Sequence, residues 1–426
     1  MTATSGALEI RPLARSGETP ALIAALARLM ADAYPVMGIS TTAALAAYTE
    51  QLVALIRDDD PVWVIAQRDG VLAGAMRLYD FQMNVRGRDA LTGGVGSVAV
   101  TRTHKRQGIA RALIAWYLDH YGARNAPFAA LYPFRADFYR ALGFGYGTPG
   151  HRYRFAPGTL RDDGARGTIR ALGVDDVDAL LECSERVRAK TNGLIARYRA
   201  VTERALADAA LRYVAVEDAG TMRGFMQTSV IAAEPGVHNR DELVVRHLAY
   251  EDQAYLAALL GYLRAQRGQF ARVVVESQDA ALYLASSDPR DGSDLSIVPP
   301  ATQRVAESGL GIMYRILDVE RALAHVPGAT APFALRLVVD DPFYAATAGA
   351  WTFQFGPQRA ARRDDTAVPD ATLTIGIHDL ASIVLGSLRV ADLVRHRLAT
   401  VEPARAASLV DAAFRAEQPP YCMTRF

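Results

Sequence analysis

The sequence predicts three consecutive domains, two of mixed α/β class with a central sheet and one of α+β class. The chain has 426 residues, of which 50% are hydrophobic, and this is more than one compact domain usually contains. Residues 1–155 and 156–310 show the same order of predicted strands and helices with few identical residues, which suggests a duplication. Residues 311–426 place strands before helices, a pattern typical of α+β domains.

The first domain is expected to be a sheet covered by helices. Its elements are, in order, a strand at 8–13, helices at 21–34 and 42–58, strands at 61–70, 71–83 and 94–100, a helix from 109, a strand at 128–134, a short helix within 135–147 and a strand at 151–155. The strands at 61–70 and 71–83 meet at Asp69 and Gly70, and Asp-Gly between apolar runs predicts a hairpin.

The second domain repeats this order and then differs at one turn. Its elements are a strand at 167–172, a helix at 174–190, strands at 212–220, 221–231 and 242–250, a helix at 252–268 and a strand at 271–277. After the strand at 242–250 come Glu251 and Asp252 without a glycine, where the first copy has basic residues and Gly108. Only the first copy is therefore expected to bind an anion at this turn.

The third domain begins with residues 312–326 and ends in an apolar tail. Strands are expected at 333–341, 349–357 and 371–380, and helices at 380–387, 389–398 and 404–417. The tail at 418–426 follows Pro419 and Pro420, which stop the last helix. It carries little of the charge of a loose terminus, so we expect it to dock rather than fray.

Composition excludes several functional classes. The formal net charge is only +1, so the chain is not expected to bind nucleic acid or a membrane surface. No apolar run approaches the ~20 residues of a membrane span, and no secretion signal is evident, so we expect a cytoplasmic protein. Eight dispersed histidines and two cysteines show no metal-ligand spacing, so no metal is expected. Serine-hydrolase and nucleotide-hydrolase motifs are not found either.

The segment 98–117 predicts an anion site, because a strand leads through a basic loop directly into a helix. Unpaired backbone N–H groups at a helix N-terminus attract phosphate oxygens. Gly108 allows close approach, Lys105 and Arg106 add positive charge, and Gln107 adds a neutral donor. One face of the helix is apolar and would pack on the sheet through Ala110, Leu113, Ile114, Tyr117 and Leu118. A helix start that merely caps well remains an alternative for this motif alone.

The combination of this loop with the rest of the domain resembles the Gcn5-related N-acetyltransferase (GNAT) superfamily, whose acetyl-CoA loop reads R/Q-x-x-G-x-G/A. Residues 105–110 match this pattern, with Lys105 in place of the usual first residue. The resemblance implies that the preceding strand pairs with the pantetheine arm and that the loop holds the pyrophosphate. It assigns donor binding to Val98, Ala99, Val100, Lys105, Arg106, Gln107, Gly108, Ile109, Ala110, Arg111, Phe134 and Arg135.

Nearly the whole chain resembles the enhanced intracellular survival (Eis) acetyltransferases. These have tandem GNAT-like domains, a C-terminal sterol-carrier-protein-like domain and a terminal phenylalanine. The resemblance implies an acetyl-CoA-dependent N-acetyltransferase that acts on primary amines, commonly aminoglycosides, and assembles as a hexamer. It makes Tyr139, which precedes Gly143 and Phe144, the general acid, and the terminal carboxylate of Phe426 the general base.

Other interpretations stay open from the sequence. Tyr139 is one of 18 tyrosines and could simply pack its helix on the sheet. Asp32 could collect a cationic acceptor or lie solvated on its helix. Arg425, next to the terminus, departs from the pattern because its charge would repel a polyamine and lower the pKa of the carboxylate. A protein-lysine acetyltransferase is one alternative function. A lipid-binding protein with an inactive acetyltransferase scaffold is another.

Overall fold

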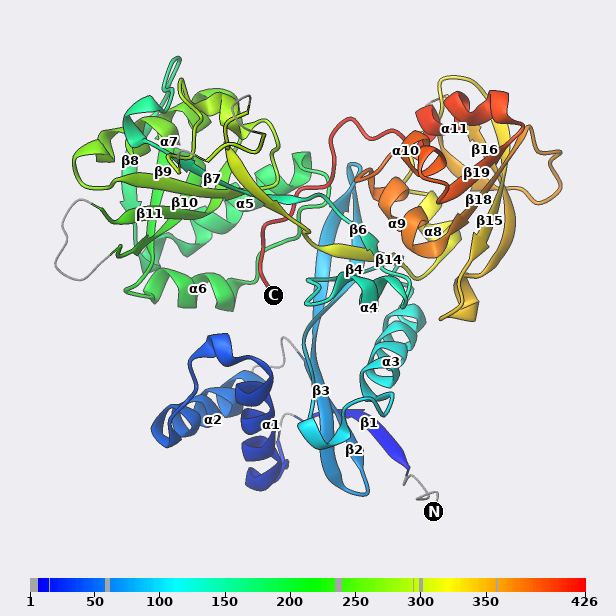
Figure 1. Ribbon diagram of the computed structural model, residues 1–426, viewed down its shortest axis with the longest axis horizontal. Helices are drawn as coiled ribbons and strands as arrows, with labels where there is room; N and C mark the ends of the chain where they lie inside the picture. The colour runs from blue at the N-terminus through cyan, green and yellow to red at the C-terminus, as the bar shows by residue number, and fades with distance from the viewer. Residues whose placement is uncertain are drawn as a thin grey trace.

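The computed structural model describes residues 7–14, 16–57, 62–233, 240–293, 295–298, 302–357 and 359–426. These residues form two seven-stranded sheets, called sheet A and sheet B, and a third sheet of five strands (Figure 1). The predicted mixed α/β and α+β class is confirmed. Within the described ranges, no helix is long and apolar enough to cross a membrane.

Sheet A belongs mainly to the first domain and has the strand order β1-β2-β3-β4-β5-β14-β6. Its strands are β1 (Leu8–Pro12), β2 (Val62–Arg68), β3 (Val71–Val85), β4 (Arg88–Val100), β5 (Phe128–Leu131), β14 (Met313–Ile316) and β6 (Gly145–Tyr146). Its helices are α1 (Pro20–Ala33), α2 (Thr42–Arg57), α3 (Ile109–Ala123) and α4 (Ala136–Arg140). β4 begins earlier than predicted, because residues 88–93 continue the antiparallel pairing with β3.

The two faces of sheet A pack on different helices, as strand alternation requires. On β2, Trp63 and Ile65 lie in one buried cluster with residues of α1 and α2. Val64 and Ala66, which point the other way, lie in a second cluster with residues of α3. Thr19 begins α1 by accepting a 3.2 Å hydrogen bond from the backbone N–H of Leu22. Both helix layers therefore follow from the period of the sequence.

Sheet B has the order β13-β7-β12-β11-β10-β9-β8 and forms the second domain. Its strands are β7 (Gly150–Phe155), β8 (Thr168–Leu172), β9 (Arg212–Asp218), β10 (Thr221–Ile231), β11 (Glu242–Tyr250), β12 (Arg272–Ser277) and β13 (Ala306–Gly309). Its helices are α5 (Val177–Lys190), α6 (Arg199–Ala207) and α7 (Gln253–Ala265). As in sheet A, an antiparallel run ends in one parallel pair, here β11 with β12.

The sheets exchange strands across the predicted boundaries at 155 and 310. β7, which the prediction places in the first domain, pairs with β12 and β13 in sheet B. β14, which the prediction places in the third domain, lies between β5 and β6 in sheet A. The first two domains are therefore joined by hydrogen-bonded strands as well as by the chain.

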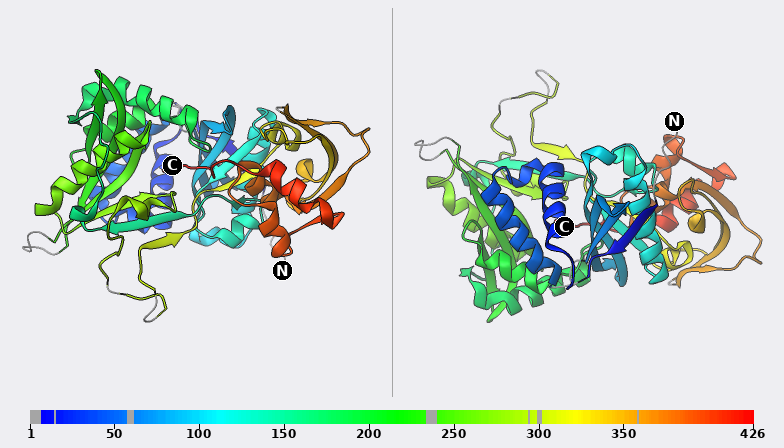
Figure 2. Two further views of the ribbon diagram at one scale, coloured as in Figure 1. Left: turned by 90° about the horizontal axis from the view of Figure 1, so that it is seen from above. Right: turned by 90° about the horizontal axis from the view of Figure 1, so that it is seen from below.

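The third sheet has the order β17-β16-β15-β18-β19. Its strands are β15 (Phe333–Asp340), β16 (Gly349–Gly356), β17 (Arg359–Arg363), β18 (Ala371–Gly376) and β19 (Ala399–Glu402), and its helices are α8 (Val319–Leu323), α9 (Ile377–Leu385), α10 (Val390–Arg395) and α11 (Ala407–Phe414). After α11 the chain leaves this domain and runs back between the first two (Figures 1 and 2). The terminus therefore lies inside the assembly of domains.

Candidate active site

The turn between β4 and α3 presents backbone N–H groups and cations to solvent. α3 begins at Ile109 after Gly108, which has φ +78°, and no side chain caps its N-terminus. Lys105 and Arg106 are exposed, and neither forms an ion pair with a residue that the structure describes. Arg106 also has a left-handed φ of 60°. The basic pair and the free helix terminus thus come together as the sequence predicts.

Some residues that were predicted to bind the acetyl donor contact other parts of the protein instead. The Gln107 amide donates to the Thr103 carbonyl at 3.1 Å and accepts from Arg68 at 2.5 Å, so it braces the loop. The Arg111 guanidinium lies over the ring of Phe343, 4.4 Å from its centroid. Ile109 is buried and Ala110 is half-buried, so both position the helix. Phe134 is 68% exposed, and Arg135 pairs with Asp137.

The strand before the turn extends beyond its parallel neighbour. β4 pairs with β5 only between residues 92 and 95 and then continues to Val100. At Ser97, whose φ is 51°, a bulge interrupts the pairing with β3. Val98, Ala99 and Val100 therefore lie beyond the last β4–β5 pair, and we call the region beside them, where the two strands no longer pair, the wedge. A linear amide chain can pair with a strand edge of this kind.

Tyr139 lies on α4 in an aromatic environment and is 2% exposed. Its ring meets those of Phe134, Phe138 and Phe144 edge to face, with centroids 5.1–5.9 Å apart. Burial raises the pKa of Tyr139, and the nearby phenol of Tyr34 adds to the rise. The hydroxyl therefore carries its proton throughout the neutral range.

Tyr34 is a site residue for which the sequence offers no signal. It ends α1, and its hydroxyl donates a 3.0 Å hydrogen bond to the carbonyl of Val98 on β4. Burial raises its pKa to about 12, with a smaller contribution from Tyr79. Two protonated phenols, Tyr34 and Tyr139, thus lie close to the strand segment predicted to bind the donor.

The terminal residue Phe426 is docked as expected. Its ring packs against Tyr79, Phe81 and Tyr132, with centroids 4.7–5.5 Å apart. Its carboxyl group lies against Gly96 on β4, because a methyl group added there would lie 3.2 Å from the carboxyl carbon and one oxygen. The terminal carboxylate is therefore placed next to the bulge that precedes Val98.

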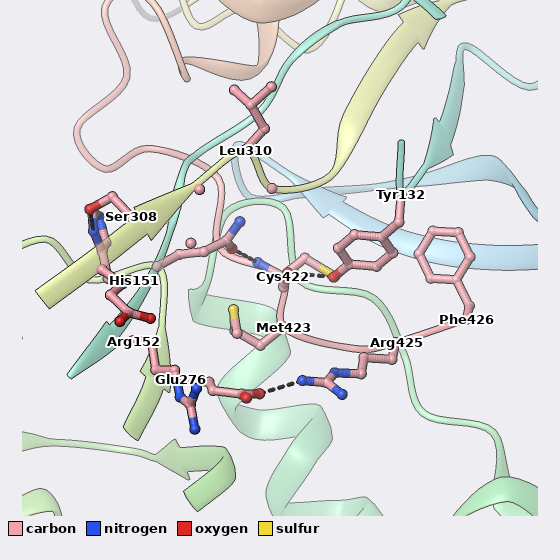
Figure 3. Close-up of a pocket in the computed structure, with 15 residues that line it drawn as sticks. Tyr132, His151, Arg152, Glu276, Ser308, Leu310, Cys422, Met423, Arg425 and Phe426 are labelled. Atoms are coloured by element: carbon pink, nitrogen blue, oxygen red, sulfur yellow. Dashed lines mark hydrogen bonds and ion pairs between the residues drawn. The ribbon is translucent and has the colours of Figure 1, made fainter. Parts of the chain in front are cut away.

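Hydrogen bonds and an ion pair fix the last residues of the tail. The Tyr132 hydroxyl bridges the carbonyls of Cys422 and Thr424 at 3.2 and 3.1 Å. Arg425 reaches away from the ring of Phe426 and pairs with Glu276 (Figure 3). The cation that was expected to repel a polyamine is therefore matched by an acidic partner.

A cavity of about 640 Å³ lies beside the tail, between residues of sheet B and the terminus (Figure 3). Its lining includes Tyr132, Arg152, Glu276, Glu307, Arg425 and Phe426. The two arginines and two glutamates balance in formal charge, and the terminal carboxylate adds one negative charge. Asp32, considered as a collector of cationic acceptors, is not among the lining residues and pairs with Arg102 at 3.2 Å on the surface.

The corresponding turn of the second domain is closed to anions. Asp252 caps α7 by accepting from the backbone N–H groups of Ala254 and Tyr255 at 2.9 and 3.4 Å. Its neighbour Glu251 is held by two arginines, Arg186 at 2.8 Å and Arg223 at 3.2 Å. Carboxylates thus occupy the helix terminus that the first domain leaves free.

Comparisons with known proteins agree with this geometry. Residues 13–147 match the family model of the acetyltransferase (GNAT) domain, and residues 319–423 match that of the sterol carrier protein domain. An uncharacterized N-acetyltransferase of Streptomyces coelicolor is 26% identical over 370 residues, which are 82% of this chain and 84% of the relative. The resemblance to the GNAT superfamily is confirmed.

Two solved structures have the same fold over essentially the whole chain. The GCN5-related N-acetyltransferase from Kribbella flavida has a TM-score of 0.77 and 22% identity, with 100% of both chains covered. Eis1 from Mycobacterium abscessus has a TM-score of 0.76 and 21% identity, with 99% of this chain and 100% of that chain covered. These structures share the fold of the chain, and the two family matches place an acetyltransferase domain before a sterol-carrier domain.

Proposed function

We propose that this chain, an acyltransferase whose residues 13–147 form a GNAT domain, transfers the acetyl group of acetyl-CoA to a primary amine. The observation that carries the donor assignment is the contrast between the two turns. In the first domain the N-terminus of α3 has no side-chain cap, and Lys105 and Arg106 beside it have no ion-pair partner in the described residues. A pyrophosphate would satisfy both the N–H groups and the cations.

The strand wedge supports the same donor. Beyond the last β4–β5 pair, the backbone of residues 98–100 can hydrogen-bond the amides of the pantetheine arm, as an added strand would. The thioester then lies farther along β4, toward Gly96 and the two phenols. The chain order of turn, strand and bulge thus matches the order of pyrophosphate, pantetheine and acetyl group in the donor.

In the proposed reaction, Tyr139 is the general acid. The neutral amine attacks the thioester carbonyl, a C–N bond forms and the C–S bond breaks. The departing CoA thiolate takes the phenolic proton of Tyr139, which its raised pKa keeps in place at neutral pH. The resulting phenolate regains a proton from solvent. The Tyr34 hydroxyl keeps Val98 in position and is not assigned a proton transfer.

The terminal carboxylate is the proposed general base. The attacking nitrogen becomes positively charged and must lose a proton, which the Phe426 carboxylate accepts directly or through one water. An α-carboxylate has an ordinary pKa near ~3.5 and is a weak base. Its contribution in this site is therefore position, since it lies against Gly96 next to the donor strand. The carboxylate then releases its proton to solvent.

The cavity beside the tail is the proposed acceptor site. Its volume of about 640 Å³ falls in the range of small-molecule pockets, which favours a small amine over a lysine on a folded protein. Aminoglycosides are included among the proposed acceptors. The pairing of Arg425 with Glu276 lowers the repulsion that a free arginine would exert on them.

The experiment is a mass-spectrometric screen with acetyl-CoA and three acceptor classes, namely aminoglycosides, simple monoamines and a lysine-containing peptide. We expect acetylated small amines with stoichiometric release of CoA, and calorimetric binding of acetyl-CoA to the free protein. If no acceptor is acetylated and acetyl-CoA gives no heat of binding, the proposed function is wrong. Acetylation of the peptide alone would support the protein-lysine alternative.

We also propose a homo-oligomer, a hexamer by resemblance to the Eis acetyltransferases. Light scattering coupled to size exclusion tests this directly. A mass close to six times the 46.1 kDa of one chain is expected. A monomer mass would contradict the proposal without affecting the chemistry described above.

A further inference from the structure

The second domain contains a wedge like the proposed donor wedge of the first. In sheet A, β4 pairs with β5 between residues 92 and 95 and then continues to residue 100, where it is paired with β3 but no longer with β5. In sheet B, β11 pairs with β12 only between residues 242 and 245 and then runs on to Tyr250. In both sheets the parallel pairing therefore stops while one strand continues, and the duplication reproduces this pattern.

The chain's own tail lies beside this second wedge. A cavity of about 570 Å³ in this region is lined by the ends of β11 and β12 and also by Pro419, Pro420 and Tyr421. Because Asp252 and the paired Glu251 close the neighbouring turn, a pyrophosphate would meet negative charge there. The wedge has therefore kept its shape and lost the means to bind a nucleotide donor.

Gln278, the first residue after β12, is the centre of the contacts between tail and wedge. It is 4% exposed and uses both ends of its amide. Its Oε1 accepts from the backbone N–H of Cys422 at 2.5 Å, and its Nε2 donates to the carbonyl of Thr148 at 2.8 Å. The Thr148 hydroxyl donates to the Pro420 carbonyl at 2.5 Å. One closed network thus fixes the tail four residues before its end.

The opposite side of the tail is held by the loop after α5. The Tyr421 N–H donates to the carbonyl of Asn192 at 2.7 Å. Gly193, with φ +83°, touches Pro420 so closely that an added methyl group would lie 2.5 Å from its Cβ. A side chain at position 193 would therefore push the tail out. Backbone bonds on one side and a fitted glycine on the other indicate a specific seat.

We propose that the second domain uses its former donor wedge as a seat for the C-terminal tail, and that Gln278 is the positioning residue that sets the place of the Phe426 carboxylate. The catalytic part of this inference rests on the proposed function, in which that carboxylate is the base. The seat itself is independent of the chemistry. The second domain then serves to position the terminal carboxylate in the active site of the first domain.

The test compares three full-length variants. Gln278→Ala removes both amide hydrogen bonds, and Thr148→Val removes the hydroxyl that holds Pro420 while it keeps the side-chain shape. Gln269→Ala, at an exposed glutamine of the same domain, is the control. Circular dichroism and melting temperature check that each variant is folded.

Two readouts separate seating from chemistry. The first is the rate at which a carboxypeptidase selective for aromatic termini releases Phe426, since protection requires a seated tail. The second is the split between kcat and the KM for acetyl-CoA. We expect Gln278→Ala and Thr148→Val to speed release of Phe426 about tenfold or more. They should lower kcat about 10- to 100-fold, because small misplacements of a reacting group are costly. The KM for acetyl-CoA should stay at the wild-type value in both variants. The control Gln269→Ala should keep the wild-type rate of Phe426 release and the wild-type kcat.

The outcomes can be told apart. If both variants release Phe426 at the wild-type rate, the seat is wrong, whatever their activity. If Phe426 is released faster but kcat is unchanged, while a chain lacking Phe426 is inactive, Gln278 is not a positioning residue and the proposed function stands. If the chain lacking Phe426 is fully active, the proposed base is wrong, and faster release in the variants would still support the seat.

Discussion

At the scale of single residues, the site contains the buried phenol of Tyr139 and the half-buried phenol of Tyr34. Tyr139 lies in an aromatic cage, and burial raises its pKa so that it stays protonated at neutral pH, while Tyr34 holds the carbonyl of Val98. Among the residues that the structure describes, the hydroxyl of Tyr34 has a protein acceptor, whereas that of Tyr139 has none. In the proposed reaction Tyr139 is therefore free to donate to the leaving group, whereas Tyr34 holds the strand that is proposed to bind acetyl-CoA.

The substitution Tyr139→Phe tests the acid. We expect kcat to fall about 10²-fold, within the range of general-acid contributions, while acetyl-CoA affinity stays unchanged. Steady-state kinetics and calorimetry measure the two quantities. The matched control is Tyr262→Phe, which removes a half-buried hydroxyl on α7 in the second domain. An unchanged kcat in the Tyr139 variant would remove this residue from the acid role.

Residue-level prediction needs a local pattern in the sequence. The basic turn at 105–108 has one because it precedes a helix, and the family resemblance points to Tyr139 because this tyrosine precedes a glycine turn. Tyr34 and Gln278 have no such pattern, because their partners, Val98 and Cys422, lie far away in the chain. The expectation for Arg425 omitted Glu276, its partner on β12, for the same reason.

At the scale of elements, the two strand-to-helix turns show how a duplicated element changes role. α3 starts at Gly108 without a side-chain cap, and α7 starts at Asp252 with a capping carboxylate. A cap satisfies the terminal N–H groups internally, whereas its absence leaves them for a ligand. Anion binding at the first turn should therefore depend on its cations.

The double variant Lys105→Ala/Arg106→Ala tests this turn. We expect the Kd for acetyl-CoA to rise about tenfold or more, because two charge-assisted contacts are lost. Calorimetry at two salt concentrations measures the change and its electrostatic part. The control Arg161→Ala/Arg204→Ala removes two exposed cations of the second domain and alters net charge equally. Equal affinities for the two double variants would place the pyrophosphate elsewhere.

A buried ion pair ties β14 to the third domain. Arg315 on β14 and Asp341 after β15 are both fully inaccessible and paired. Arg315 also donates to the Leu142 carbonyl at 2.5 Å, and its guanidinium occupies the space where Gly143 would carry a side chain. The turn that follows Tyr139 is thereby joined to a strand from beyond residue 310.

Removal of one partner should be costly. We expect Asp341→Ala to lower the free energy of unfolding by about 3–5 kcal/mol, because it leaves a buried guanidinium without a counter-ion. Urea denaturation measures this. The control is Asp340→Ala, the exposed neighbour at the end of β15. Similar losses in both variants would show that the ion pair does not stabilise this joint.

Acid should weaken β11 through His247. This imidazole is 8% exposed and stacks on Phe225, with centroids 5.5 Å apart. Burial, and secondarily the charge of Arg197, hold its pKa well below 6.5. The folded state keeps the imidazole neutral, whereas the unfolded state binds a proton below about pH 6.5. The free energy of unfolding therefore decreases as the pH is lowered below about 6.5.

The variant His247→Gln should lose part of this acid sensitivity. Between pH 8 and pH 5.5, we expect the free energy of unfolding of the wild-type protein, measured by urea denaturation, to fall more than that of the variant, by up to about 1.4 kcal/mol per pH unit below pH 6.5. His396→Gln, at an exposed histidine of the third domain, is the control. Parallel pH profiles for wild type and His247→Gln would contradict this assignment.

Element prediction failed at the strand exchange, for a physical reason. β6 has two residues and β14 has four, and their pairing depends on contacts between segments more than 160 residues apart. Short strands carry little periodic signal, so neither their partners nor the move of β7 into sheet B can be predicted locally. The long helices and the central hairpin strands were predicted because their apolar periods are sustained.

At the scale of the whole molecule, all three domains contact the C-terminal tail, residues 418–426. The tail leaves the third domain after α11, crosses the second-domain wedge at Pro420 and ends against Gly96 of the first (Figures 1 and 2). Docking of the tail was predicted from its composition. Its route was not, because it depends on how the domains are placed. The position of the terminal carboxylate thus depends on how all three domains are arranged.

The most direct test is the turnover of two variants, one that lacks Phe426 and one that is extended by a glycine after Phe426. Both changes displace the terminal carboxylate from Gly96 and leave the donor turn untouched. We expect both proteins to bind acetyl-CoA with wild-type affinity by calorimetry and to lose kcat about 10²-fold or more. Wild-type kcat in either protein would contradict the account, because another group would then have to accept the proton of the amine.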